Sequence, residues 1–124
     1  MSETLQPLAA GAPFDPAEAL DRLDGDVELL RDVVGLVEEE WRRQSEAIES
    51  AFGRSDAAAL SAAAHSLKGA VGQLLSAGQA AGAARVEHAA RAGDLVTAEA
   101  AWRSAAPQIQ SCLAAAGRWA REEQ

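Results

Sequence analysis

The sequence has no tyrosine, and its other aromatic side chains are two phenylalanines and three tryptophans. Aromatic and β-branched side chains are the ones that strands favour, and no stretch shows the strict apolar–polar alternation of a half-buried strand. Hydrophobic residues still make up 48 % of the 124 residues, many of them alanine, which has the highest helix propensity. These features predict one all-α domain, because a chain of this length buries a single core.

Only one cysteine is present, Cys112, so an internal disulfide is excluded. Its neighbours Ser111 and Leu113 provide neither a metal-ligand spacing nor a redox pair. Free cysteine is among the most buried residue types. We therefore interpret Cys112 as a small residue of the hydrophobic core.

Basic residues are in the minority, with 11 lysines and arginines against 19 acidic residues and a formal net charge of −8. Such a charge repels nucleic-acid backbones and anionic lipid surfaces, so we expect no nucleic-acid partner and no membrane insertion. The first 13 residues contain no basic segment followed by an apolar run, so neither a signal peptide nor a membrane span is predicted. A cytoplasmic location is the resulting expectation.

Residues 1–13 also lack any periodic pattern and contain Pro7, Gly11 and Pro13. We interpret them as a flexible N-terminal arm that precedes a helical domain at residues 14–124. Asp15 followed by Pro16 is typical of a helix start and predicts a short helix to about Leu23.

Four longer helices follow in the hydrophobic pattern. Gly25 and Asp26 predict a stop and a new N-cap, after which a long amphipathic helix runs to Gly53. The apolar positions of this helix are Leu30, Val34, Val37, Trp41, Ile48 and Phe52. Its opposite face, which we expect to be solvated, carries Glu38, Glu39, Arg42, Arg43, Glu46 and Glu49.

The second long helix begins after Ser55-Asp56 and continues through Leu75. Its apolar stripe consists of Leu60, Ala64, Leu67, Val71 and Leu74. A turn is predicted at residues 76–78, then a helix to Arg91, a stop at Gly93, and a last helix capped by Asp94. Four helices with one apolar stripe each predict an antiparallel four-helix bundle with a short additional N-terminal helix.

His65 faces away from the apolar stripe of its own helix. Because each residue advances by about 100°, His65 lies roughly 140° from the mean direction of that stripe and is expected to be exposed. Gly69 and Gly72 lie on the same outward side, where each is about 1 kcal/mol less favourable than alanine. Glycine at these positions suggests a surface kept bare for the approach of another protein.

Lys68 is three residues after His65 and therefore its neighbour on the helix surface. Its ammonium could offset the negative charge of a phosphoryl group on the imidazole. The alternative is an ordinary surface histidine beside an ordinary surface lysine. The spacing alone does not decide between these two interpretations.

Three segments resemble the histidine-containing phosphotransfer (HPt) domain family. The segment Ala64-His65-Ser66-Leu67-Lys68-Gly69 is similar to the phosphorylation-site signature of that family. The segment from Leu23 to Leu30 resembles the usual start of its first long helix. The segment from Val86 to Asp94 resembles the end of the helix that follows the histidine helix. The resemblance extends over about residues 14–120. Gln73 and Leu75 depart from the pattern, so the exit of the histidine helix could be longer or differently turned.

The resemblance implies that His65 accepts a phosphoryl group on its distal ring nitrogen from a receiver-domain aspartyl phosphate of a hybrid sensor histidine kinase. His65 would then donate it to the receiver aspartate of a response regulator. Lys68 would stabilise the phosphoryl group and Gly69 would leave room for the receiver. Further residues of the receiver-docking surface would be Gly72, Ser61 and Val71. The chain would need no cofactor of its own, because Mg²⁺ belongs to the partner receiver domain.

Glu87 falls where some members of the family place a carboxylate or amide that hydrogen-bonds the other ring nitrogen of the histidine. The alternative is a solvent-facing helix acid. Arg91 could contact the partner, although an arginine near a helix C-terminus is also favoured by the helix dipole alone. His88 has no phosphotransfer signature around it and is interpreted as an ordinary helix residue.

The sequence offers no glycine-rich phosphate loop, no metal-ligand cluster and no nucleophile with a matching base. We therefore expect a monomeric phosphoryl carrier without a kinase or phosphatase active site of its own. The alternative is a helical adaptor that docks on receiver domains without relaying phosphate. Phosphorylation of His65 distinguishes the two.

Overall fold

The computed structural model describes residues 14–122, so the predicted arm at residues 1–13 lies outside the described residues. Within them the chain forms five helices and no strand, as the scarcity of strand-forming residues predicts. The helices are α1 (Pro16–Arg22), α2 (Val27–Gly53), α3 (Ala57–Leu74), α4 (Ala77–Arg91) and α5 (Leu95–Glu122).

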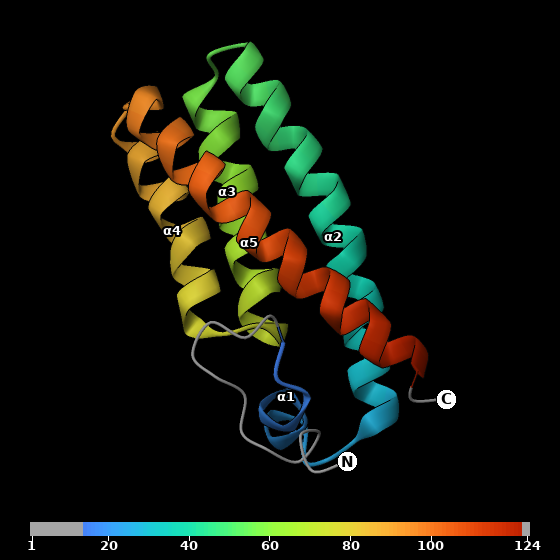
Figure 1. Cartoon of the computed structure of the whole chain (residues 1–124). Helices are drawn as coiled ribbons and strands as arrows, with labels where there is room; N and C mark the ends of the chain where they lie inside the picture. Colours follow the sequence, from blue (N-terminus) through green and yellow to red (C-terminus); the bar gives the residue numbers. More distant parts are fainter. Residues whose placement is uncertain (1–13, 123–124) are drawn as a thin grey trace.

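The four long helices alternate in direction and form a closed bundle (Figure 1). Helix α3 packs between α2 and α4, and α5 closes the bundle against both α4 and α2. In Figure 1, α5 crosses the front of the bundle at an angle, while the short α1 lies across the end opposite the α2–α3 turn. The predicted antiparallel four-helix bundle with a short additional N-terminal helix is confirmed.

Aspartate side chains cap the helices that the sequence predicted them to cap. Asp26 accepts from the backbone N–H of Leu29 at 3.0 Å, and Asp56 accepts from that of Ala59 at the same distance. Asp15 and Asp94 act in the same way at the starts of α1 and α5. Each carboxylate provides an acceptor for a first-turn N–H that has no partner within its own helix.

The turn between α3 and α4 is shorter than the sequence predicted. Leu75 is extended and 4 % exposed, and the Ser76 side chain accepts from the N–H of Gln79, so that α4 already begins at Ala77. Residues 79–82, which show little apolar pattern, are therefore helical. The departure from the family pattern at Leu75 does not lengthen the exit of the histidine helix.

The core is made of the predicted apolar stripes. Leu30, Ile48, Leu60, Leu67 and Ile109 are all fully buried. Cys112 lies among them at 4 % exposure, and burial raises the pKa of its thiol, which confirms its interpretation as a core residue. Helices α4 and α5 approach closely at Gly82, where a methyl group would lie 3.0 Å from Cβ of Ala105.

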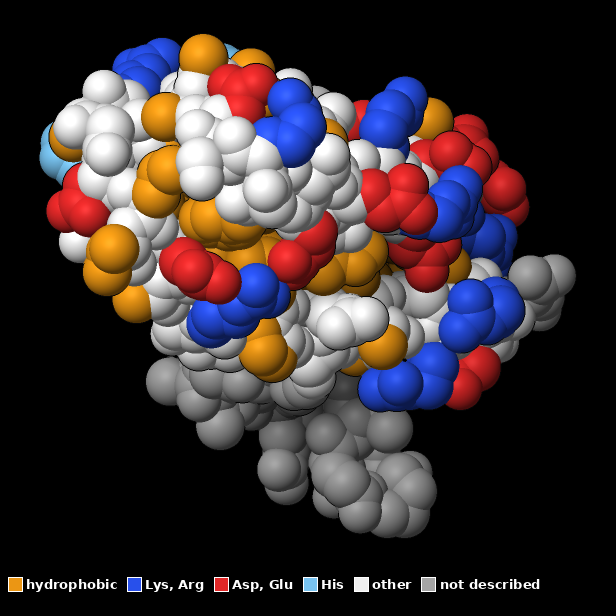
Figure 2. Space-filling view, turned by 90° about the horizontal axis from the view of Figure 1, so that it is seen from above, with side chains coloured by type: hydrophobic (Ala, Val, Ile, Leu, Met, Phe, Trp, Pro, Cys, Tyr) orange, Lys and Arg blue, Asp and Glu red, His pale blue; other side chains and the backbone are white. Residues whose placement is uncertain are grey.

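Charged side chains of both signs lie close together on the surface. Figure 2 looks onto the end of the bundle that carries the α2–α3 and α4–α5 turns, and acidic and basic side chains are intermixed there with apolar ones visible between them. In the α2–α3 turn, for example, Arg54 pairs with Asp56 at 3.0 Å. The net negative charge of the chain is therefore not gathered into one acidic patch on this end.

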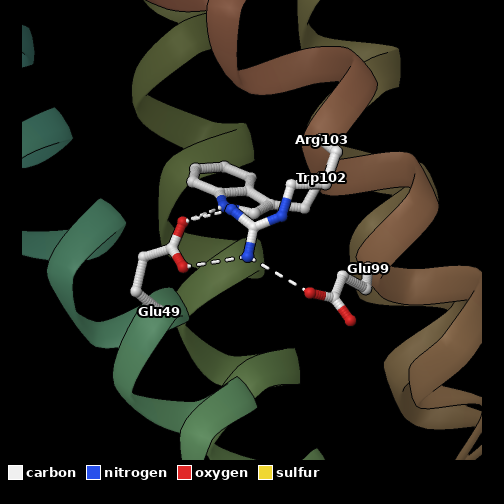
Figure 3. A network of polar contacts seen from close by, with 4 residues as sticks. All are labelled: Glu49, Glu99, Trp102 and Arg103. Atoms are coloured by element: carbon white, nitrogen blue, oxygen red, sulfur yellow. Dashed lines mark hydrogen bonds and ion pairs between the residues drawn. The ribbon is translucent and has the colours of Figure 1, made fainter.

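Glu49 joins α2 to α5 (Figure 3). Its Oε2 accepts from the indole N–H of Trp102 at 2.7 Å, and its carboxylate accepts two further bonds from Arg103 at 2.9 and 3.2 Å. Trp102 is 2 % exposed and packs on Trp41 with ring centroids 5.6 Å apart. Glu49 is exposed, as expected for the α2 charge run, and its carboxylate is in addition the hydrogen-bond partner of a buried indole.

The hydrogen bond from Trp102, followed by that from Arg103, lowers the pKa of Glu49. A carboxyl whose pKa is lower in the folded than in the unfolded chain contributes stability above its ordinary pKa. That contribution is lost as the pH falls through the lowered pKa of the folded state.

Glu49→Ala should reduce the free energy of unfolding by about 1–2 kcal/mol at neutral pH, mainly because the indole N–H loses its acceptor.

Urea unfolding of both proteins at several pH values measures this difference, which should shrink as the pH falls below the ordinary carboxyl range. Glu46→Ala on the same helix is the matched control, since Glu46 is exposed and in the same charge run. An equal loss of stability in the two variants, or a difference that does not change with pH, would contradict the role given to Glu49.

Candidate functional site

His65 lies in the middle of α3 with 62 % of its side chain exposed. Its position on the outward side of the helix agrees with the helical spacing. The ring is not free in its orientation, because Nδ1 lies 2.9 Å from Oε2 of Glu87 on the neighbouring helix α4. The imidazole is thus exposed at one nitrogen and bound at the other.

The Glu87 side chain is only 6 % exposed, so its interpretation as a solvent-facing helix acid is wrong. Helix α4 buries Val86 and Ala90 in the core, and this places Glu87 on the flank that faces α3. There its carboxylate meets His65, and it also lies 2.9 Å from Nζ of Lys68 and 3.1 Å from the guanidinium of Arg91. We call Glu87 with these three partners the Glu87 cluster.

The structure brings together four of the residues that the sequence singled out, from two helices. Lys68 is 37 % exposed and Arg91 is 67 % exposed, so both cations reach the buried carboxylate from the surface. Arg91 lies one turn after Glu87 on α4, and Lys68 lies one turn after His65 on α3. In this structure the Lys68 ammonium is directed to Glu87.

The hydrogen bond from Lys68 is the largest cause that lowers the pKa of Glu87, and the bond from His65 and the charge of Arg91 act in the same direction. Burial opposes them but is outweighed. Glu87 is therefore ionised at neutral pH, and an ionised carboxylate can only accept hydrogen bonds. A neutral His65 must then carry its proton on Nδ1, which leaves Nε2 with its lone pair available.

Gly69 and Gly72 border the imidazole on the exposed side of α3. A methyl group at Gly69 would meet nothing within 4 Å, and one at Gly72 would make an ordinary contact of 4.0 Å with Cβ of Ala80. Packing inside the bundle therefore requires glycine at neither position. Open space beside an exposed ring nitrogen is what the approach of another active site needs.

The other two residues predicted for the docking surface differ in position. Ser61 is half-buried on α3, one turn before His65. Val71 is fully buried, so the prediction that its side chain lies at the docking surface is wrong. Val71 belongs to the apolar stripe with Leu67 and Leu74, and that stripe faces the core.

An open groove of about 600 Å³ lies between α2 and α3, and Gly69 belongs to its lining, which makes the groove continuous with the surface around His65. Leu36 stands at the groove and is 68 % exposed, so it adds apolar surface there. Sequence reasoning did not find Leu36, although a leucine off the buried stripe of an amphipathic helix is a usable signal. The lining residues are Leu36, Val37, Glu39, Glu40, Arg43, Ser66, Gly69, Ala70 and Gln73.

Among residues 14–122, no group of three or more histidine, cysteine or acidic side chains is placed to hold a metal ion. In the same part of the chain, none of the helices combines the length and the apolar character that crossing a membrane demands.

The structure is a four-helix bundle that presents one exposed imidazole at mid-helix, held at Nδ1 by a buried carboxylate. The sequence matches the family model of the Hpt domain over residues 32–119, which include the whole Glu87 cluster. No curated protein and no solved structure matches the chain. The chain belongs to the Hpt domain family, whose members are phosphocarriers that interact with receiver domains in two-component phosphorelays.

The geometry of the ring predicts one dominant tautomer at a pH where His65 is neutral. ¹⁵N chemical shifts of the imidazole should show a protonated Nδ1 and an unprotonated Nε2, because Glu87 accepts from Nδ1. Glu87→Ala should shift the ring towards the mixture of tautomers that a solvated histidine shows. His88, which is exposed on the same helix, provides the internal reference. Identical ¹⁵N shifts of His65 in the two proteins would contradict this orienting role.

Proposed function

We propose that Nε2 of His65 carries a phosphoryl group from the receiver aspartate of a hybrid sensor histidine kinase to the receiver aspartate of a response regulator. The observation that supports this role is the 2.9 Å contact between Nδ1 and the buried carboxylate of Glu87. Because this contact holds the ring proton on Nδ1, the exposed Nε2 has no proton, and an unprotonated nitrogen can attack phosphorus.

In the accepting step, the Nε2 lone pair forms a bond to phosphorus while the bond between phosphorus and the donor aspartate oxygen breaks. The electron pair of that bond stays with the aspartate, which leaves as a carboxylate. The proton on Nδ1 does not move, and the positive charge that develops on the ring faces Glu87. Donation to the second aspartate is the reverse, so neither direction requires a proton transfer.

Lys68 is the cation closest in sequence to the reacting ring, and we assign it to the phosphoryl oxygens once the group is bound to Nε2. An ammonium can turn on its flexible stem, and the exposure of Lys68 leaves it room to do so. We expect the remaining electrophilic assistance, including Mg²⁺, in the acidic site of the receiver domain. In this proposal the chain holds no cofactor of its own and acts as the co-reactant.

The receiver domain would dock on the face formed by α2 and α3, over Gly69, Gly72 and Ser61. Leu36 and the groove beside Gly69 offer an apolar contact next to the reacting nitrogen. A transient relay interface needs only a small contact of this kind. We propose that the chain works as a monomer in the cytoplasm.

Phosphate incorporation tests the proposal directly. A receiver domain phosphorylated with acetyl phosphate should transfer acid-labile, base-stable phosphate to the wild-type chain and not to His65→Gln. The substitution should change the free energy of unfolding by less than about 1 kcal/mol, because the ring is mostly exposed. His88→Gln is the control and should be labelled like the wild type.

No label on the wild-type chain with several competent donors would contradict the relay and favour a non-relaying adaptor. Label that survives in His65→Gln would place the reaction on another residue. A large loss of stability in His65→Gln would contradict the exposed position of the ring.

Gly69→Leu tests the docking face. The added side chain should leave the fold intact, because nothing lies within 4 Å of a methyl group at this position. It should weaken receiver binding at least tenfold, a steric cost of about 1.4 kcal/mol or more. Gly53→Leu is the matched control, since Gly53 is also an exposed helical glycine with open space around it, at the end of α2 and beyond the α2 residues that line the groove.

Titration of each variant with a labelled receiver domain measures the affinity. Equal affinities for Gly69→Leu and Gly53→Leu would show that the receiver does not approach over Gly69.

A further inference from the structure

Lys68 has one partner in the structure, the Glu87 carboxylate, and a second partner in the proposed function, the phosphoryl group. Its Nζ lies 2.9 Å from Oε1 of Glu87. The same ammonium is the group assigned above to the phosphoryl oxygens on His65. One ammonium has three donors but one charge, so a strong ion pair with one anion weakens its pairing with the other.

We propose that Glu87 competes with the phosphoryl group for Lys68 and thereby makes the phosphohistidine more ready to give up its phosphoryl group. This inference rests on the proposed function. Before phosphorylation the ammonium stays on Glu87. After phosphorylation the ammonium is divided between two anions, so the phosphoryl group is less stabilised than it would be beside an uncharged residue.

The burial of Glu87 gives the competition its strength. The carboxylate is 6 % exposed, so water replaces a departing Lys68 poorly, whereas it solvates an exposed surface carboxylate well. The two remaining partners, His65 and Arg91, both reach Oε2. Oε1 is bound by Lys68 alone among the contacts of the described residues, and it loses that contact when the ammonium turns to phosphate.

Arg91 acts as the positioning residue of this competition. Its guanidinium lies 3.1 Å from Oε2, and it offsets part of the carboxylate charge when Lys68 leaves. Removing Arg91 should therefore strengthen the hold of Glu87 on Lys68. The phosphohistidine should then lose its phosphoryl group faster.

The test uses phosphoramidate, a small donor that needs no partner protein. Nε2 attacks its phosphorus, the P–N bond of the donor breaks, and ammonia leaves. The excess donor is removed and the half-life of the phosphohistidine is followed by ³¹P NMR. In this hydrolysis water attacks phosphorus, and the electron pair of the Nε2–P bond returns to the ring.

Glu87→Gln has nearly the same shape, and its amide oxygen can still accept from Nδ1, but it has no charge to hold Lys68. The half-life should become about two- to fivefold longer, the range expected for one partly exposed ion pair. In the Lys68→Ala background the same substitution should lengthen the half-life less, because only its effect on the charge of the ring remains. An equal effect in both backgrounds would mean that Glu87 acts through the ring proton, and would overturn the competition.

Arg91→Ala provides a second test that does not change the buried carboxylate. Because Arg91 is 67 % exposed, this variant is expected to fold. The half-life should be shortened in the wild-type background and unchanged in the Lys68→Ala background. An unchanged or longer half-life in the wild-type background would overturn the inference.

The outcomes separate this inference from the proposed function. If phosphoramidate does not label His65 of the wild-type chain, the carrier role fails and the inference fails with it. If His65 is labelled but Glu87→Gln has the half-life of the wild type, the carrier role stands and the competition alone is wrong.

Discussion

The site depends on one buried carboxylate that is shared by three cationic or hydrogen-bonding side chains. A carboxylate at this depth is unfavourable without partners, because burial removes most of its water. His65, Lys68 and Arg91 supply those partners from two helices and keep Glu87 ionised. The same carboxylate accepts from Nδ1 of His65, so the tautomer of the ring follows from the packing of α4 on α3.

The rest of the bundle holds α4 in that position. On one side, Glu87 faces α3, and on the other, the absence of a side chain at Gly82 lets α4 approach Ala105 of α5 closely. Helix α5 is in turn attached to α2 through Glu49 and Trp102. A ring of four helices that are each packed on two neighbours resists a shift of any one of them, which keeps the imidazole and the carboxylate within hydrogen-bonding distance.

The fold was readable from local signals. Asp15, Asp26, Asp56 and Asp94 predicted the helix starts because a capping side chain and its backbone partner are only two or three residues apart in sequence. Gly25 and Gly93 predicted two stops, and both adopt the positive φ that favours glycine. The turn between α3 and α4 was predicted too wide, because its two extended residues, Leu75 and Ser76, follow from the burial of Leu75 against the core, which no local pattern encodes.

The site was only partly readable. Periodicity predicted the exposure of His65, and the same periodicity placed Val71 in the core, so its assignment to the docking surface contradicted the stripe to which it belongs. The position of the Glu87 side chain remained undecided, because whether a helix acid faces solvent or the neighbouring helix depends on the rotation of α4 about its axis. The groove beside Leu36 required the structure, since it is formed by two helices and neither sequence segment alone describes it.

The short link at Leu75 and Ser76 has a consequence for how this chain can tolerate insertions. A single added residue that extends the start of α4 would turn the rest of that helix by about 100° relative to α3, which is enough to carry Glu87 away from the imidazole. The turn between α2 and α3 has no such role, because neither partner of the ring hydrogen bond precedes it in the chain. Length variation should therefore be tolerated at Arg54 and Ser55 but not between α3 and α4, where the length of the backbone determines whether Glu87 reaches the imidazole.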